Sequence, residues 1–120
     1  MKKFLAIYIG GPAGLERTKW NEMDDETREA REKAGMQAWQ DWGAKHAANI
    51  VGDGSPLGKT KRVATEGTSD IKNVMAAYSL VQAESHEAAA KMFEDHPHFT
   101  IFPGDAVEIM ECLPMPGSGE

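Results

Sequence analysis

The chain has 120 residues, 41% of them hydrophobic, and a formal net charge of −6 at pH 7. Its length is typical of one domain with one core. Its acidity and its lack of a Lys/Arg stripe argue against nucleic acid and anionic membrane surfaces as partners, and no apolar run approaches the roughly 20 residues that span a bilayer.

Two further features favour a cytoplasmic location. The apolar run at 4–9 ends at Gly10 and Gly11, and is shorter than the apolar core of about 7–15 residues in a signal peptide. Cys112 is the only cysteine, which excludes an intrachain disulfide and CxxC redox chemistry. We expect Cys112 to be a small buried residue.

The first half of the chain predicts a strand, a loop and a long helix. Residues 4–9 are β-branched and aromatic, which predicts a strand that is apolar on both faces. The glycines and proline that follow predict a loop over 10–23. A helix should begin at Asp24 or Asp25, which can cap its free N–H groups, and run to about residue 47. Helical spacing gives it an inward stripe: Gly35, Ala38, Trp39, Trp42 and His46.

The middle of the chain predicts a polar hairpin and a second apolar strand. Residues 49–52 are extended, and a turn at 58–60 leads into 61–66, which together make a hairpin suited to a sheet margin. Residues 67–72 read as a loop. Residues 75–83 form a strand that, like 4–9, needs cover on both sides.

The last third predicts a short helix, a strand and a tail. Ser85 is a good N-cap for a helix over 86–95, which Pro97 should stop. Residues 106–112 alternate, with Val107 and Ile109 on one face and Glu108 on the other. We expect residues 1–113 to form the domain and 114–120 a flexible tail.

The order strand, helix, strand, strand, helix, strand predicts an α+β, ferredoxin-like βαββαβ protomer with a four-stranded antiparallel sheet. Two helices cover only one face, yet the central strands are apolar on both. The simplest cover for the second face is another copy of the same sheet. We therefore expect a homodimer whose facing sheets enclose a cleft for a small organic ligand.

Several segments together resemble the YCII-related (YciI-like) family of dimeric α/β-barrel proteins. They are "MKKFLAIYIGG", "MQAWQDWG", "VGDGSPLG", "AYSLVQAESHEAA" and "DHPHFTIFPGDAVEIMEC", and the match covers about residues 2–113. The resemblance implies a ferredoxin-like protomer and a dimeric barrel, without an established activity for most members. A related group includes dehydrochlorinases of chlorinated hydroxyhydroquinones. The His-Asp pair proposed for YciI-like members has no clear counterpart, because Asp41 and His46 lie in the long helix.

His96 and His98 flank Pro97, and an extended segment would point both rings to one side, as a shared pocket requires. Histidine is also the side chain best suited to proton transfer near neutral pH. The alternative is structural: His96 would cap the second helix, and His98 would form a hydrogen bond in the loop after it.

Glu108 and Tyr8 complete the set of candidate site residues. Glu108 has apolar neighbours on its face, so it is either a buried carboxylate that needs a partner or an edge-strand residue that faces water. Tyr8 could offer its hydroxyl to the mouth of the cleft, or it could simply pack with its hydroxyl satisfied. Trp39 and Trp42 read as core anchors between helix and sheet.

No cofactor or metal is expected. A metal site would have to use His96, His98 and Glu108, but an HxH pattern alone is a weak signal and no second cluster supports it. The glycines at 10–14 lack the GxGxxG pattern and the lysine of a phosphate-binding loop. No GxSxG or Cys-His arrangement favours covalent catalysis.

Two functions follow. The first is a small-molecule-binding protein without catalysis, since the sequence carries no specific catalytic signature. The alternative is a cofactor-independent enzyme that isomerises a small cyclic organic acid or phenol, or eliminates a group from it. In that enzyme His98 would be the general base with His96 beside it, Glu108 would orient it or act as acid, and Tyr8 would stabilise an oxyanion.

Overall fold

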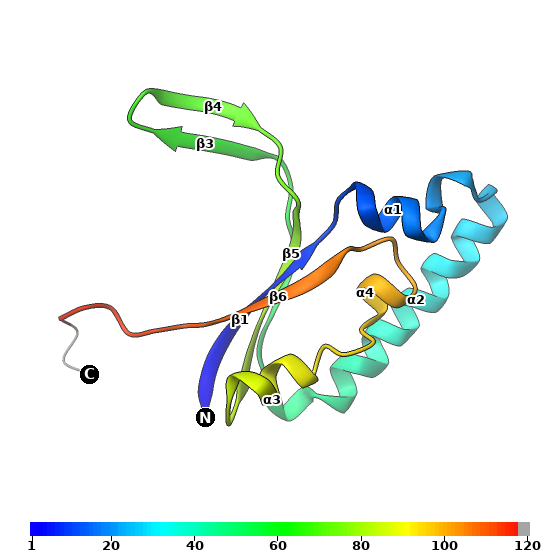
Figure 1. The fold of residues 1–120 in the computed structure, drawn as a ribbon. Coiled ribbons are helices and arrows are strands. Elements are labelled where there is room, and N and C mark those ends of the chain that lie inside the picture. The colour runs from blue at the N-terminus through cyan, green and yellow to red at the C-terminus, as the bar shows by residue number, and fades with distance from the viewer. Residues whose placement is uncertain (118–120) are drawn as a thin grey trace.

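The fold is built on one four-stranded antiparallel sheet, and a two-stranded hairpin projects from it (Figure 1). The structure is a computed structural model that describes residues 1–117. The sheet has the order β2-β5-β1-β6, and its strands are β1 (Lys2–Ile9), β2 (Ile50–Pro56), β5 (Met75–Ala83) and β6 (Ala106–Glu111). The hairpin consists of β3 (Thr60–Ala64) and β4 (Gly67–Ile71).

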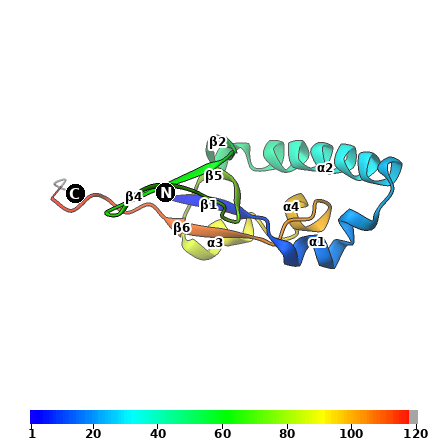
Figure 2. The same ribbon diagram turned by 90° about the horizontal axis from the view of Figure 1, so that it is seen from above.

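Four helices connect these strands: α1 (Pro12–Thr18), α2 (Asp25–Lys45), α3 (His86–Lys91) and α4 (Pro97–Thr100). Short 3-10 turns lie at Trp20–Glu22 and Ala47–Asn49. Seen from above, α1, α2 and α4 lie on one side of the strands, while the hairpin and the residues that follow β6, up to 117, extend to the other (Figure 2). The strand order confirms the predicted ferredoxin-like, α+β fold. No helix within residues 1–117 is both long and apolar enough to cross a membrane.

The two faces of the sheet differ. On β1 the side chains of Phe4, Ala6 and Tyr8 are buried beneath the helices, whereas Leu5 and Ile7 lie on the opposite face and remain partly accessible. We call this second face the open face. It also carries the residues paired with Leu5 and Ile7 on β5, and with Leu5, Ile7 and Ile9 on β6, namely Tyr78, Leu80, Ala106, Glu108 and Met110. The prediction that the central strands are apolar on both sides is therefore confirmed.

Helix α2 begins where the sequence indicated. The side chain of Asp24 accepts a hydrogen bond from the Thr27 N–H at 2.7 Å, which satisfies one of the free donors of the first turn. Gly35 is its one buried residue, and Trp39 and Trp42 pack against the core, so the predicted inward stripe is confirmed. The indole N–H of Trp42 donates to the carbonyl oxygen of Met92 at 2.6 Å and ties the helix to the segment after α3.

The predicted loop over 10–23 is wrong in its first half, because residues Pro12–Thr18 form α1. Proline suits the first turn of a helix, where its missing N–H costs nothing. Contacts distant in sequence hold the helix in place: the Gly14 N–H donates to Asp105 Oδ1 at 2.6 Å, and Arg17 donates to the carbonyls of Phe99 and Gly104.

The predicted hairpin is present with a different pairing. Strand β2 joins the edge of the main sheet beside β5 instead of pairing with β3. Strand β3 pairs with β4, which occupies the stretch 67–72 that the sequence suggested was a loop. Gly67, at φ 123°, takes a backbone conformation that favours glycine and lets this tight turn close.

The predicted helix over 86–95 is too long, and Pro97 starts a helix instead of only ending one. Helix α3 ends at Lys91, and Asp95 turns the chain with a left-handed φ of 57°. Pro97 then occupies the first turn of α4. Cys112 is exposed, which corrects the expectation that it is buried. Part of the predicted tail, residues 118–120, lies outside the described residues.

Two glycines of α2 provide a test of this packing. A Cβ at Gly35 would lie 2.6 Å from Cε2 of Phe102, whereas a Cβ at Gly43 would meet nothing within 4 Å. Alanine favours the helix over glycine by up to about 1 kcal/mol, but overpacking costs about 1–3 kcal/mol. We expect Gly35→Ala to lower the free energy of unfolding and Gly43→Ala to raise it, as measured by urea denaturation. Changes of the same sign in both variants would contradict this packing.

Candidate functional site

The segment His96-Pro97-His98 forms the N-terminus of α4. His96 is its N-cap, and Nδ1 of its ring accepts a hydrogen bond from the backbone N–H of His98 at 3.0 Å. Because Nδ1 is the acceptor, the neutral ring carries its proton on Nε2. Nε2 is buried and has no hydrogen-bond partner among the described residues.

Aromatic rings surround His96. Its ring centroid lies 4.5 Å from that of Trp39, 4.7 Å from that of Trp42 and 5.2 Å from that of Tyr8. Both tryptophan contacts are edge-to-face, an arrangement in which an N–H can point at a π-face. Burial lowers the pKa of His96 to about 3, with further lowering from His98 and His46, so the ring is neutral at physiological pH.

His98 is buried as well, and its Nε2 lies 2.7 Å from the carbonyl oxygen of Ile9. A carbonyl only accepts hydrogen bonds, so Nε2 carries the proton and donates it to the backbone. Burial lowers the pKa of His98, while the Ile9 carbonyl and Asp105 oppose the shift. A Cβ at Gly104 would collide with this ring, which explains the glycine there.

Tyr8 reaches the same cluster from β1, and its ring centroid lies 5.4 Å from that of His98. Its hydroxyl is 3.0 Å from Oγ of Ser79, and Ser79 Oγ donates in turn to the Asp53 carbonyl at 3.4 Å. Burial raises the pKa of Tyr8, partly offset by the Ser79 hydrogen bond. The phenol therefore stays protonated and acts as a hydrogen-bonding group.

The fold brings together three of the four predicted site residues, namely Tyr8, His96 and His98, and keeps Glu108 apart from them. Glu108 pairs with Ile7 on the open face, while Tyr8 points to the helix-covered face. The Glu108 side chain is exposed and β6 is an edge strand, so the arrangement matches the alternative in which Glu108 faces water.

A cavity of about 370 Å³ opens beside this cluster, between α2 and the β2–β5 side of the sheet. We call it the helix-side cavity. Its lining residues come from five segments of the chain: Tyr8, Met36, Trp39, Asp53, Gly54, Ser55, Pro56, Ala77, Tyr78, Ser79 and Phe102. Its volume lies within the range of roughly 300–1,000 Å³ that is typical of small-molecule sites.

Of the predicted site residues, Tyr8 alone lines this cavity. Signals in the sequence for the other lining residues were weak. Met36 and Trp39 are spaced for one face of α2, but Trp39 reads equally well as a core residue. Residues 52–54 look like a turn, whereas they form an irregular part of β2 in which Gly54 has a φ of 68°. A Cβ at Gly54 would collide with the carbonyl oxygen of Tyr78.

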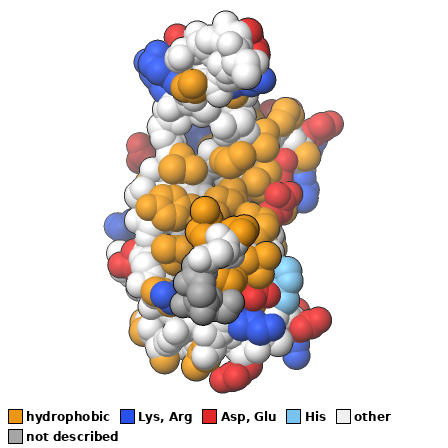
Figure 3. All heavy atoms as spheres, turned by 90° about the vertical axis from the view of Figure 1, so that its left-hand side faces the viewer, with side chains coloured by type: hydrophobic (Ala, Val, Ile, Leu, Met, Phe, Trp, Pro, Cys, Tyr) orange, Lys and Arg blue, Asp and Glu red, His pale blue; other side chains and the backbone are white. Residues whose placement is uncertain are grey.

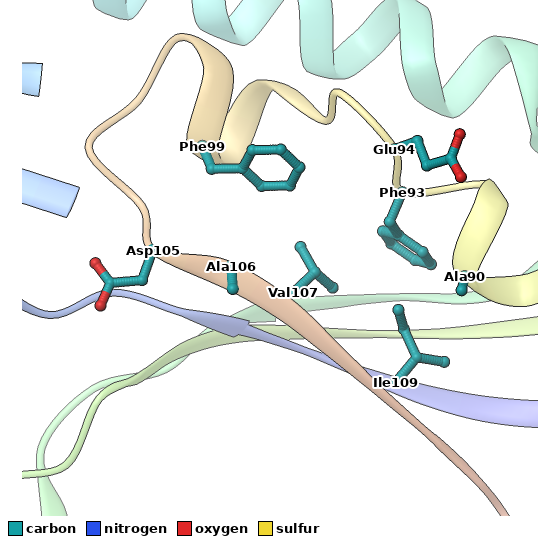
Figure 4. A pocket seen from close by; sticks show the side chains of 8 residues that line it. All are labelled: Ala90, Phe93, Glu94, Phe99, Asp105, Ala106, Val107 and Ile109. Carbon is teal, nitrogen blue, oxygen red and sulfur yellow. The ribbon is translucent and has the colours of Figure 1, made fainter. Parts of the chain in front are cut away.

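A second cavity of about 360 Å³ lies between α3, α4 and the edge strand β6 (Figure 4). Phe93, Phe99, Val107 and Ile109 surround it. The carboxylates of Glu94 and Asp105 point away from its centre (Figure 4). With few polar groups directed inward, this cavity offers little to orient a ligand, and the helix-side cavity is the stronger candidate site.

The described residues contain no group of three His, Cys, Asp or Glu side chains placed to hold a metal ion. His96 and His98 already use ring nitrogens in hydrogen bonds to the protein, and Glu108 lies on the other side of the sheet.

Comparison with known proteins gives only distant structural similarity. No family model and no curated protein matches the chain. A solved structure of 5-chloro-2-hydroxyhydroquinone dehydrochlorinase from Burkholderia phenoliruptrix AC1100, in complex with 2,5-dihydroxybenzoquinone, is similar over 90% of each chain, with 19% identity and a TM-score of 0.49. A similarity this distant carries no information about activity or substrate. The relationship to the YCII-related group therefore stays a prediction.

The buried His96 predicts acid lability. Its folded-state pKa of about 3 lies below the ordinary value of 6.5, so the unfolded chain binds the extra proton as pH falls from 6.5 to 3. The stabilisation is complete above pH 6.5, and acidification should remove up to about 1.4 kcal/mol per pH unit. We expect His96→Asn, which keeps a capping acceptor, to flatten the plot of unfolding free energy against pH.

The matched control is His86→Asn, at an exposed position on α3 outside this cluster. It should leave the slope between pH 6.5 and 5 as in the original chain. Equal slopes for the original chain and His96→Asn would show that His96 does not stay neutral in the folded protein.

Proposed function

We propose that the protein is a homodimer that binds a small, ring-containing organic molecule in the helix-side cavity. The observation that carries this proposal is the cavity itself, which combines aromatic walls with a few hydroxyl and carbonyl groups. Such a lining gives a ligand apolar area for affinity and a small number of polar contacts for orientation. The sequence analysis expected the ligand between two sheets, whereas this cavity lies on the helix-covered side.

The walls suit a flat ring. The rings of Tyr8 and Trp39 lie 4.9 Å apart and those of Trp39 and Phe102 6.1 Å apart, so together they form a continuous aromatic surface. The hydroxyls of Tyr8 and Ser79, which bond to each other, lie at the base of the sheet side. A ring stacked on this surface could exchange hydrogen bonds with them.

The dimer is proposed because residues 1–117 provide no helix that covers the open face. Hydrophobic side chains gather on the side towards which the hairpin and C-terminal residues project (Figure 3). The projecting segments carry exposed Val63, Leu113 and Met115. The radius of gyration is 16.5 Å, compared with roughly 14 Å for a compact chain of this length. A second copy would cover the apolar face and give these segments a partner surface.

This proposal agrees with the resemblance to the YCII-related group, which implies a dimeric barrel. The geometry gives less support to the alternative, an enzyme that works by general acid-base catalysis. His96 and His98 donate or accept hydrogen bonds within the protein, and Glu108 lies on the other face, which leaves Tyr8 as the predicted group in contact with the cavity. Turnover of a bound compound, abolished in Tyr8→Phe, would support that alternative.

Filling the cavity should abolish binding. Ala77 lines the helix-side cavity from β5, and a larger side chain there would occupy the space meant for a ligand. We expect some small ring compounds to raise the midpoint of thermal unfolding, because a ligand at 100 times its Kd adds about 2.7 kcal/mol of stability. Ala77→Met should lose these shifts, while Ala44→Met on the exposed side of α2 should keep them. Equal shifts in both variants would locate binding elsewhere.

Disrupting the open face should separate the copies. Ile7 lies at its centre, between Tyr78 and Glu108 on the neighbouring strands. Sedimentation at micromolar concentration should give twice the 13.1 kDa of one chain. We expect Ile7→Glu to give a single chain, since a second carboxylate beside Glu108 would be buried at the interface without a positive partner. Ala34→Glu on exposed α2 should leave the dimer intact. A 13.1 kDa particle for the unaltered protein would refute the dimer.

A further inference from the structure

The lining of the helix-side cavity contains an acidic side chain and no basic one. None of its residues is Lys, Arg or His, and Asp53 is the one carboxylate among them. The phenol of Tyr8 is kept protonated because burial raises its pKa. A bound carboxylate or phosphate would therefore find no positive partner in the lining and one negative neighbour.

Asp53 joins the lining of the helix-side cavity from the irregular part of β2, where the pairing with β5 shifts register between Gly52 and Ser55. Its carbonyl oxygen accepts a hydrogen bond from Ser79 Oγ at 3.4 Å, which ties this part of β2 to the sheet side of the cavity.

The Asp53 carboxylate makes no hydrogen bond or ion pair with the described residues, as the four ion pairs of residues 1–117 lie elsewhere on the surface. Its side chain is at an exposed position next to the cavity. The carboxylate is therefore free to pair with a ligand at the mouth of the site.

Aromatic residues of the lining can also attract a cation. Trp39, Tyr8 and Phe102 all line the cavity, and Trp39 is the ring type that attracts cations most strongly. Trp39 and Phe102 are partly accessible to a ligand, whereas Tyr8 is almost completely buried. An ammonium group between these rings and Asp53 would be stabilised from two directions.

We propose that the helix-side cavity takes a small organic cation, an amine or quaternary ammonium attached to a ring, and discriminates against organic acids. This inference rests on the proposed function, because it assigns a ligand class to the same cavity. It also reverses the charge of the substrate class that the sequence suggested, a small cyclic organic acid.

Three probes of similar size and different charge test the proposal: benzyltrimethylammonium, benzyl alcohol and benzoate. Their binding to the full chain is measured by isothermal titration calorimetry at one ionic strength. We expect the cation to bind at least about tenfold more tightly than benzoate, given the attraction from the rings and the carboxylate. Asp53→Asn should weaken binding of the cation about threefold to tenfold and leave benzyl alcohol unchanged.

The net charge of −6 attracts cations to the whole surface, so a control must remove a charge elsewhere. Asp41→Asn makes the same change on α2, where Asp41 accepts a hydrogen bond from Gln37 outside the cavity. It should leave all three affinities as they were. Equal weakening in both variants would overturn the proposal, because the preference would then come from overall charge.

The failure of this inference is distinguishable from failure of the proposed function. If benzoate binds as tightly as the cation, and Ala77→Met removes both, the cavity is a ligand site of another class. If none of the three probes binds at millimolar concentration, the cation proposal is overturned and the small-molecule site loses its support with it.

Discussion

A layer of aromatic rings sets the distance between α2 and the sheet. Helix α2 buries only Gly35 completely, so direct packing of its backbone on the strands contributes little. Trp39 and Trp42 bridge the gap, and His96 fits between them and Tyr8 with its ring neutral. Because these rings are rigid and densely packed, they act as spacers that hold the helix above the strands.

This spacing explains where the helix-side cavity lies. Towards the C-terminal end of α2 the gap is filled, because Trp42 packs against Phe93 with ring centroids 5.1 Å apart. Towards Met36 no ring of comparable size fills the space between α2 and β2, and the cavity remains. Gly35 lets Phe102 approach the helix closely and close one wall. The cavity is thus a consequence of which turns of α2 carry large side chains.

The sequence predicted the elements that depend on local pattern and missed what depends on distant contacts. The strand at 75–83 has the predicted bounds, because its apolar pattern is strong, and the Asp24 cap marks the start of α2. Helix α1 was missed because its support comes from Asp105, far along the chain. The histidine pair was located, but its burial depends on rings from β1 and α2. The cavity, built from five segments, leaves no continuous sequence signal.

The burial that makes His96 and His98 poor bases also shapes the electrostatics of the site beside them. A histidine exposed to water is partly protonated near neutral pH, and a cation behind the Tyr8 ring would favour anionic ligands. Here desolvation lowers the pKa of His96 to about 3 and lowers that of His98 as well, so the wall behind Tyr8 carries no positive charge. Asp53 is then the one carboxylate in a cavity lining that contains no Lys, Arg or His. Because burial disfavours the charged form of both histidines, they would not attract anionic ligands to the cavity.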